Sequence, residues 1–143
     1  MAQIEFQAMH LVQEPDSPFD RQARIPWWDQ EKLAQARVMV AGAGALGNEV
    51  LKNLALIGVG TLLVVDFDTI EDSNLSRALL FRQADVSGRK AEIAAERARH
   101  LNPNPAVIVS ALHGDLVWEV GDGVYRHVDL VIGCLDNIEA RLA

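Results

Sequence analysis

The sequence contains one cysteine, Cys134, which cannot close a disulfide within the chain. The first residues lack the basic start and continuous apolar run of a secretory signal. No stretch approaches the roughly 20 apolar residues that a membrane-spanning helix needs. These absences predict a reducing, cytoplasmic setting without a membrane partner. Because half of the 143 residues are apolar, we expect one domain with one sizeable core.

Positive charge is also scarce, since the formal net charge is −7. This balance disfavours nucleic-acid binding and anionic membranes, because both need a basic face on the protein. We therefore expect no nucleic-acid partner. A bound nucleotide stays compatible with an acidic chain if arginine and lysine gather locally or if a divalent metal shares the task.

Apolar, β-branched segments alternate with amphipathic segments, which is typical of βαβ units and a parallel sheet. Residues 1–20 are expected to form a flexible N-terminal arm, and residues 21–143 a Rossmann-like, doubly wound, mostly parallel α/β domain that is incomplete in its C-terminal half. The expected strands cover residues 37–41, 61–66, 106–111 and 128–135, in the spatial order 3-2-1-4. The expected helices cover residues 28–36, 47–58 and 87–101. Residues 112–127 show no legible pattern.

The helix expected after Gly47 has apolar residues at steps of three and four, with Gly58 as its C-terminal stop. Asn48, Glu49 and Lys52 fall between the apolar positions. They are therefore expected on the polar face of this helix.

A glycine-rich loop lies between the first expected strand and this helix. Gly42-Ala-Gly44-Ala-Leu-Gly47 fits the pattern G-x-G-x-x-G. The first glycine permits a tight turn, the second lets phosphate approach the backbone, and the third lets the helix pack on the strand. The helix N-terminus supplies unpaired N–H groups, so phosphate is the expected ligand.

Asp66 ends the second expected strand, where a carboxylate commonly accepts hydrogen bonds from ribose hydroxyls. The alternative is a solvated aspartate at a strand end. The loop and Asp66 alone would suit an NAD-dependent oxidoreductase equally well.

Polar residues beyond Asp66 favour ATP over NAD. Asn74 and Arg77 are three residues apart, so on one turn both can reach a single polyphosphate. With Ser87 as N-cap, Arg89 and Lys90 would lie in a first helical turn, where cations oppose the helix dipole. A cation at this unfavourable position indicates a function, in which a bound phosphate would supply the opposite charge. We assign this role to Lys90 and expect Arg89 to be a solvated surface cation.

A series of motifs makes the resemblance to a family specific. The series is Arg21-Gln22, the glycine loop, Asp66-Phe-Asp68, Ser73-Asn-Leu-Ser-Arg77, Gly88-Arg-Lys90, Leu101-Asn-Pro103, and Cys134-Leu-Asp-Asn137 with Arg141. In order and approximate spacing it resembles the adenylation domains of ubiquitin-activating-like (E1-like) enzymes of the ThiF/MoeB/HesA type. These include the bacterial activators of the thiamine and molybdopterin sulfur carriers. The resemblance covers about residues 19–143.

The resemblance implies ATP-dependent adenylation of the C-terminal carboxylate of a ubiquitin-like or sulfur-carrier protein, giving an acyl-adenylate and pyrophosphate. It implies ATP contacts from Gly42, Gly44, Ala45, Gly47, Asp66, Asp68, Ser73, Asn74, Arg77 and Lys90. It implies catalytic roles for Arg21, Arg77, Lys90 and Asp136, with Asp136 holding Mg²⁺. Arg21 would reach the ATP site of a partner protomer, which requires a dimer, expected to be a homodimer.

Several of these assignments have plain structural alternatives. Arg21 could be an ordinary surface cation in the arm, and Asp136 could be an N-cap for a helix over residues 137–141. The position of Asp136 just past the last expected strand supports a site, because ligands of open α/β sheets lie at this edge. Cys134 is expected to be a small buried hydrophobe and not a nucleophile.

The sequence also departs from the family pattern. Ala45 stands where the family often has another glycine, and Ala78 where it often has Gln. The sequence ends before the region of the paired Cys-x-x-Cys zinc ligands, so no zinc site is expected within these residues. Two other interpretations stay open at this point: an NAD-binding oxidoreductase domain, and a non-catalytic E1-like module for dimerisation or partner docking.

Overall fold

In the computed structural model, which describes residues 17–136 and 142, four parallel strands form one sheet in the order β3-β2-β1-β4. The strands are β1 (Arg37–Ala41), β2 (Thr61–Val65), β3 (Ile108–Leu112) and β4 (Leu130–Gly133). This order and the parallel pairing confirm the predicted Rossmann-like α/β fold. The bounds of β1 are those expected, and the other three strands overlap their expected ranges.

The central strand β1 is buried on both faces, as parallel strands in α/β folds usually are. Val38 and Val40 point to one face of the sheet and join the larger core, whereas Met39 points to the other face and joins a smaller one. The alternation follows the two-residue period of a strand. Both faces of the sheet therefore need a covering layer.

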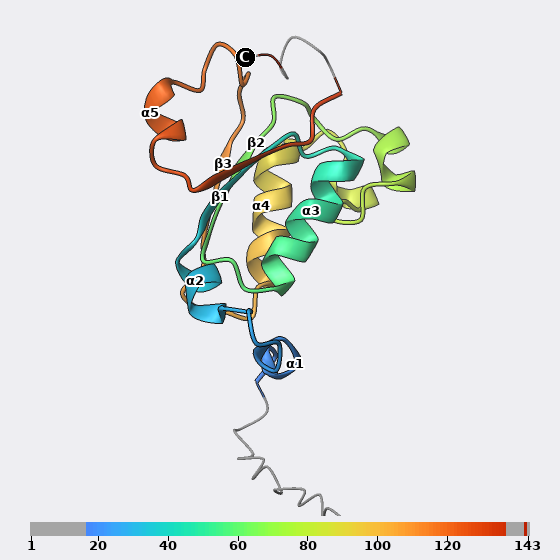
Figure 1. The fold of residues 1–143 in the computed structure, drawn as a ribbon. Coiled ribbons are helices and arrows are strands. Elements are labelled where there is room, and N and C mark those ends of the chain that lie inside the picture. Colours follow the sequence, from blue (N-terminus) through green and yellow to red (C-terminus); the bar gives the residue numbers. More distant parts are fainter. Residues whose placement is uncertain (1–16, 137–141, 143) are drawn as a thin grey trace, which may run out of the picture.

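Two helices, α3 (Ala45–Leu56) and α4 (Lys90–Leu101), cover the first face (Figure 1). In α4 the buried apolar residues follow helical spacing and are all alanine: Ala91, Ala94, Ala95 and Ala98. Small side chains on this face let the helix lie close to the sheet. Leu51 and Ala55 of α3 are fully buried in the same core.

The second face of the sheet is covered by part of residues 112–127, for which the sequence analysis predicted no element. It contains α5 (Asp122–Tyr125), which lies across the sheet from α3 and α4 in Figure 1. Val120 and Val124 of this segment pack with Met39 and Val65 in the smaller core. This covering segment could not be predicted from a periodic pattern, because most of its apolar residues lie outside any regular helix or strand.

Short helices complete the described chain. They are α1 (Asp20–Ala23), α2 (Gln30–Gln35), and the 3₁₀ helices η1 (Asp72–Ser76) and η2 (Gln83–Asp85). The helix expected over 28–36 is thus shorter, because Asp29 caps it by accepting from the backbone N–H of Lys32. The flexible arm was predicted over residues 1–20, and residues 1–16 of it lie outside the described residues. Within the described part of the chain, no helix has the length and apolar character to cross a membrane.

Gly58 ends α3 as expected. Its φ is +84°, its N–H donates to the Ala55 carbonyl at 3.0 Å, and the Val59 N–H donates to the Leu54 carbonyl at 3.1 Å. This pair of bonds is the Schellman arrangement, in which a left-handed residue closes a helix.

The prediction of Ser87 as the N-cap of α4 is wrong. Its φ is +71°, its N–H donates to the Ile70 carbonyl, and the Gly88 carbonyl accepts from the Ile70 N–H, both at 2.8 Å. These bonds draw residues 87–88 alongside Ile70 in an extended pairing. The helix therefore starts at Lys90, with Arg89 as N-cap.

We expect Gly58→Ala to lower the free energy of unfolding by about 1–2 kcal/mol, the usual cost of a side chain in the left-handed region. The added Cβ would also lie 2.6 Å from the Phe19 ring. Urea denaturation followed by circular dichroism measures the effect. Gly123→Ala is the control, because Gly123 lies in α5 with nothing within 4 Å of an added Cβ. Equal stability of the two variants would contradict this account of Gly58.

Candidate functional site

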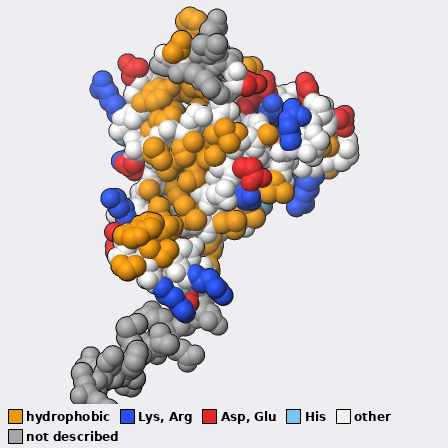
Figure 2. All heavy atoms as spheres, turned by 45° about the vertical axis from the view of Figure 1, so that its right-hand side comes forward, with side chains coloured by type: hydrophobic (Ala, Val, Ile, Leu, Met, Phe, Trp, Pro, Cys, Tyr) orange, Lys and Arg blue, Asp and Glu red, His pale blue; other side chains and the backbone are white. Residues whose placement is uncertain are grey.

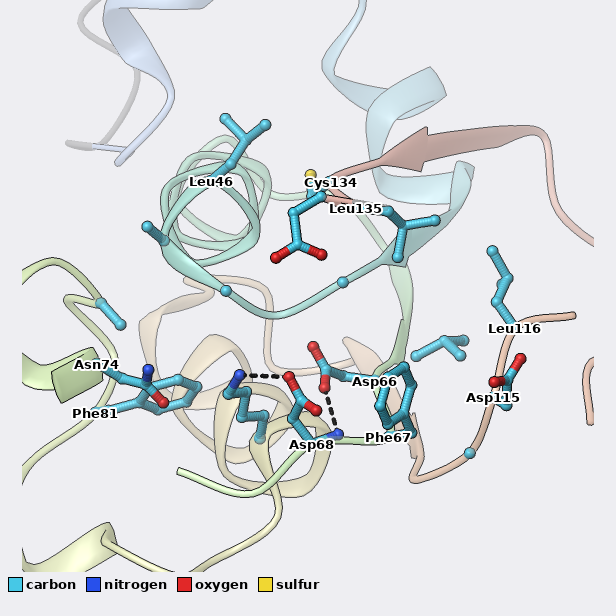
Figure 3. A pocket seen from close by; sticks show the side chains of 18 of the residues that line it. Leu46, Asp66, Phe67, Asp68, Asn74, Phe81, Asp115, Leu116, Cys134 and Leu135 are labelled. Atoms are coloured by element: carbon cyan, nitrogen blue, oxygen red, sulfur yellow. Dashed lines mark hydrogen bonds and ion pairs between the residues drawn. The ribbon is translucent and has the colours of Figure 1, made fainter. Parts of the chain in front are cut away.

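A cavity of about 490 Å³ lies at the carboxyl-terminal edge of the sheet (Figure 3). Its lining comes from the glycine loop, the end of β2, residues 74–81, Lys90, residues 114–118 and residues 134–136. The volume suits a small-molecule ligand. The location is the one at which open α/β sheets bind their ligands.

The three loop glycines have different surroundings. A Cβ at Gly42, whose φ is +97°, would lie 2.7 Å from the Cys134 carbonyl oxygen, and one at Gly47 would lie 1.9 Å from the Gly42 carbonyl oxygen. A Cβ at Gly44 would meet nothing within 4 Å. The chain's own packing therefore requires Gly42 and Gly47, whereas Gly44 leaves space open beside the cavity that it lines.

Asp66 is engaged with the backbone around it. One carboxylate oxygen accepts from the Ala43 N–H at 2.6 Å and the other from the Asp68 N–H at 2.7 Å. Figure 3 shows this carboxylate facing the cavity. Asp66 therefore braces the glycine loop. A carboxylate has about four lone-pair sites, so capacity remains for further donors such as hydroxyls.

Lys90 is held by an internal partner. Its ammonium lies 2.7 Å from Asp68 Oδ2, a contact drawn as a dashed line in Figure 3. The backbone N–H of Lys90 donates to the Asp68 carbonyl at 3.0 Å. The Lys90 side chain is 11% exposed and that of Asp68 is 51% exposed. The counter-charge that the sequence assigned to phosphate is thus supplied by Asp68 in this structure.

Asn74 and Arg77 both line the cavity from η1 and its end. The Asn74 side-chain oxygen accepts from the Glu71 N–H at 3.0 Å, and the Arg77 guanidinium donates to the Ser73 carbonyl at 2.7 Å. Each side chain is thus oriented by a local bond. Ser73 itself does not line the cavity, and its carbonyl positions Arg77 instead.

Cys134 and Asp136 reach the cavity from the end of β4. Burial raises the pKa of the Cys134 thiol. The thiol is therefore protonated at neutral pH and is a poor nucleophile, in line with a structural role. The exposed carboxylate of Asp136 belongs to no group of three or more metal ligands among the described residues. The alternative role of Asp136 as an N-cap concerns residues 137–141, which lie outside the described residues.

The structure does not bring every predicted site residue to the cavity. Arg21 lies on α1, beyond the amino-terminal ends of the strands, where Phe19 approaches Gly58 (Figure 1). Within one chain it is far from the glycine loop. Gly47 lies behind the loop, in α3, and not on the cavity wall.

Some site residues were missed by the sequence analysis. Asn48, expected on a polar face, is fully buried, and its side chain bonds the glycine loop and the Leu80 N–H. The cavity wall also includes Phe67, Phe81, Asp115, Leu116, Val117 and Trp118. The position of residues 114–118 directly after β3 was the available signal, because loops at this edge of a parallel sheet meet at the site.

The charges around the cavity do not balance. Four carboxylates, those of Asp66, Asp68, Asp115 and Asp136, line it together with two cations, Arg77 and Lys90. Their formal sum is −2. A polyphosphate ligand in this cavity would need a further cation.

Comparison with known families decides what kind of chain carries this cavity. The model of the ThiF family matches residues 19–143. The chain belongs to the ThiF family. This membership confirms the resemblance seen in the motifs, and it favours a nucleotide site of the E1-like type over an NAD-dependent one.

The chain is similar to a ubiquitin-like modifier-activating enzyme and to an adenylyltransferase and sulfurtransferase. It is 47% identical over 119 residues to human ubiquitin-like modifier-activating enzyme 7, covering 78% of this chain and 12% of that protein. It is 39% identical over 134 residues to the Aspergillus fumigatus adenylyltransferase and sulfurtransferase uba4, covering 92% of this chain and 27% of that protein.

A solved structure agrees with the fold. Escherichia coli MccB, crystallised with MccA-N7isoASN, superposes with a TM-score of 0.64 at 30% identity, over 77% of this chain and 31% of MccB. The ThiF-family chain thus spans less than a third of each of these three proteins.

The Lys90–Asp68 pair can be tested without any ligand. We expect Asp68→Asn to lower the free energy of unfolding by about 1 kcal/mol, a value for a partly exposed ion pair. In a Lys90→Met background the same change should cost less, because no buried ammonium then loses its partner. Urea denaturation of the double-mutant cycle measures the coupling. Glu92→Gln, which removes the exposed Arg89–Glu92 pair, is the control. Full additivity at residues 68 and 90 would contradict the coupling.

Proposed function

We propose that the cavity binds ATP with Mg²⁺ and forms the nucleotide site for adenylation of the C-terminal carboxylate of a ubiquitin-like or sulfur-carrier protein. The observation that carries this proposal is the convergence of Gly44, Asn74, Arg77 and Lys90 on one cavity. The names of the relatives support the chemistry. Because the chain spans only part of those proteins, the whole reaction stays a proposal.

The phosphates would lie against the glycine loop. The first N–H groups of α3 have no acceptor within the helix, and a helix N-terminus favours anions. Arg77 and Lys90 supply positive charge, and the Asn74 amide supplies a donor. The free lone pairs of Asp66 would accept from the ribose hydroxyls.

The cavity suits a Mg²⁺ ion that arrives with the nucleotide. Mg²⁺ is usually held by one or two carboxylates together with substrate phosphates and water. Asp136 would be its protein ligand, which fits an exposed carboxylate outside any preformed metal cluster in the described chain. When bound, the ion would offset the excess of carboxylates and the charge of the departing pyrophosphate.

In the proposed reaction a carboxylate oxygen of the carrier attacks the α-phosphorus of ATP. The bond from this phosphorus to the bridging oxygen breaks, and its electron pair leaves with pyrophosphate. This step needs no nucleophile from the enzyme, which agrees with a protonated, partly buried Cys134. The chain's residues would act by positioning the phosphates and by stabilising the charge that develops on them.

Partner contacts would use the exposed apolar surface. Figure 2 shows apolar side chains gathered over the face that it presents. Leu46, Leu56, Leu79 and Trp27 are between 48% and 78% exposed. Apolar surface of this kind often marks protein contacts. We propose a homodimer in which Arg21 reaches the site of the second copy, because it cannot reach the cavity of its own chain.

Calorimetric titration with MgATP and, separately, with NAD tests the nucleotide. We expect ATP to bind and Lys90→Ala or Arg77→Ala to weaken it at least about tenfold, as expected for loss of a charged phosphate contact. Arg89→Ala is the matched control, since Arg89 pairs with Glu92 and does not line the cavity. Preferential binding of NAD would contradict the proposal.

Carrier-dependent exchange of pyrophosphate into ATP tests the reaction. Arg77→Ala and Asp136→Ala should lower the exchange rate by about 100-fold or more, the usual effect of removing electrostatic stabilisation. Asp122→Ala, on α5 and outside the cavity, should leave it unchanged. Unchanged exchange in both site variants would contradict the assignment. A wild-type chain that binds ATP without exchange would favour the non-catalytic interpretation.

A further inference from the structure

Asn48 is a polar side chain with no exposed surface, and it lies behind the cavity wall. Its amide nitrogen donates to the Ala43 carbonyl at 2.8 Å and to the Gly44 carbonyl at 2.9 Å. Its oxygen accepts from the Leu80 N–H at 2.8 Å. Because an amide has two N–H donors, both are used, and the oxygen is occupied as well.

The bond to the Ala43 carbonyl orients the glycine loop from the side chain of Asn48, and the Gly44 carbonyl accepts from both the side chain and the backbone N–H of Asn48, each at 2.9 Å. A peptide unit is planar and trans, so its C=O and N–H point in opposite directions. With the carbonyls of Ala43 and Gly44 held toward Asn48, the N–H groups of Gly44 and Ala45 are turned away from it. Gly44 and Ala45 line the cavity. The loop is braced from its other side by Asp66, which accepts from the Ala43 N–H at 2.6 Å.

The third bond ties the loop to the segment that carries Arg77. Leu80 is three residues beyond Arg77, and its neighbours Ala78 and Phe81 are buried with it. Asn48 and Leu80 are 32 residues apart in sequence, so no local turn would otherwise set their distance. One buried amide thus connects two separate parts of the cavity wall.

We infer that Asn48 is a positioning residue that aligns the loop N–H groups with Arg77, so that both contact the same polyphosphate. The inference rests on the proposed ATP site. Asn48 touches no ligand itself, and its effect is confined to the part of the site that binds phosphate. Its loss should therefore weaken ATP binding and spare the binding of adenosine, which has no phosphate.

Asn48→Asp is the informative variant, because aspartate keeps the size and an acceptor oxygen while losing both donors. Asn102→Asp is the matched control. Asn102 is also buried, donates to the Val59 carbonyl at 2.9 Å and accepts from the Asn104 N–H at 2.8 Å, but it lies outside the cavity. Both variants lose hydrogen bonds that a buried side-chain amide donates to backbone carbonyls. Asn48→Ser, which adds no charge, serves if Asn48→Asp does not fold.

The affinities for MgATP and adenosine are measured by calorimetry on variants that circular dichroism shows to be folded. Asn48→Asp or Asn48→Ser should weaken ATP binding by about tenfold or more, the effect of misplacing a hydrogen bond to a charged group. Adenosine affinity should stay unchanged, and Asn102→Asp should alter neither. Equal losses for both ligands, or unchanged ATP affinity, would overturn the inference.

A second readout needs no nucleotide. Hydrogen exchange at the Leu80 amide should be faster in Asn48→Ser, whose shorter side chain does not reach the Leu80 N–H, and unchanged in Asn102→Asp. Unaltered exchange in Asn48→Ser would overturn the coupling of loop and segment. A wild-type chain that binds no ATP is a different result, because it would overturn the proposed function on which the inference rests.

Discussion

The close contact between the start of α3 and the end of β1 sets the position of everything at the carboxyl-terminal edge of the sheet. A Cβ at residue 47 would lie 1.9 Å from the Gly42 carbonyl oxygen, and one at residue 42 would lie 2.7 Å from that of Cys134. Helix and strands approach this closely only because both positions lack side chains. The cavity wall at the glycine loop is consequently backbone, and Cys134, the residue after β4, lies directly beside Gly42.

Around this backbone wall, several polar side chains are held by bonds to their own chain. Asp68 holds Lys90, the Ser73 carbonyl holds Arg77, and Asp66 and Asn48 brace the loop from two sides. Side chains that are already oriented lose less conformational entropy when a ligand binds. Within the described chain, the Lys90 ammonium pairs with Asp68 and the Arg77 guanidinium donates to the Ser73 carbonyl, so both cations of this acidic site already have a partner.

Features that depend on neighbouring residues were predictable from the sequence. The strand over 37–41 follows from its unbroken apolar run, and the stop at Gly58 follows from the tolerance of glycine for positive φ. Ser87 shows where such reasoning fails. Its preference for helix N-caps is a local tendency of about 1 kcal/mol, and the backbone bonds between residues 87–88 and Ile70 outweighed it.

By itself the sequence determined the α/β class, the strand order and the ThiF-family motifs, because hydrophobic period and motif spacing can be read along the chain. Only the tertiary structure decided which groups pair. Lys90 meets Asp68 across 22 positions and Asn48 meets Leu80 across 32. It likewise decided that residues 114–118 wall the cavity and that Asn48 is buried. A one-dimensional pattern contains no distance between such residues, since that distance is set by how the helices pack on the sheet.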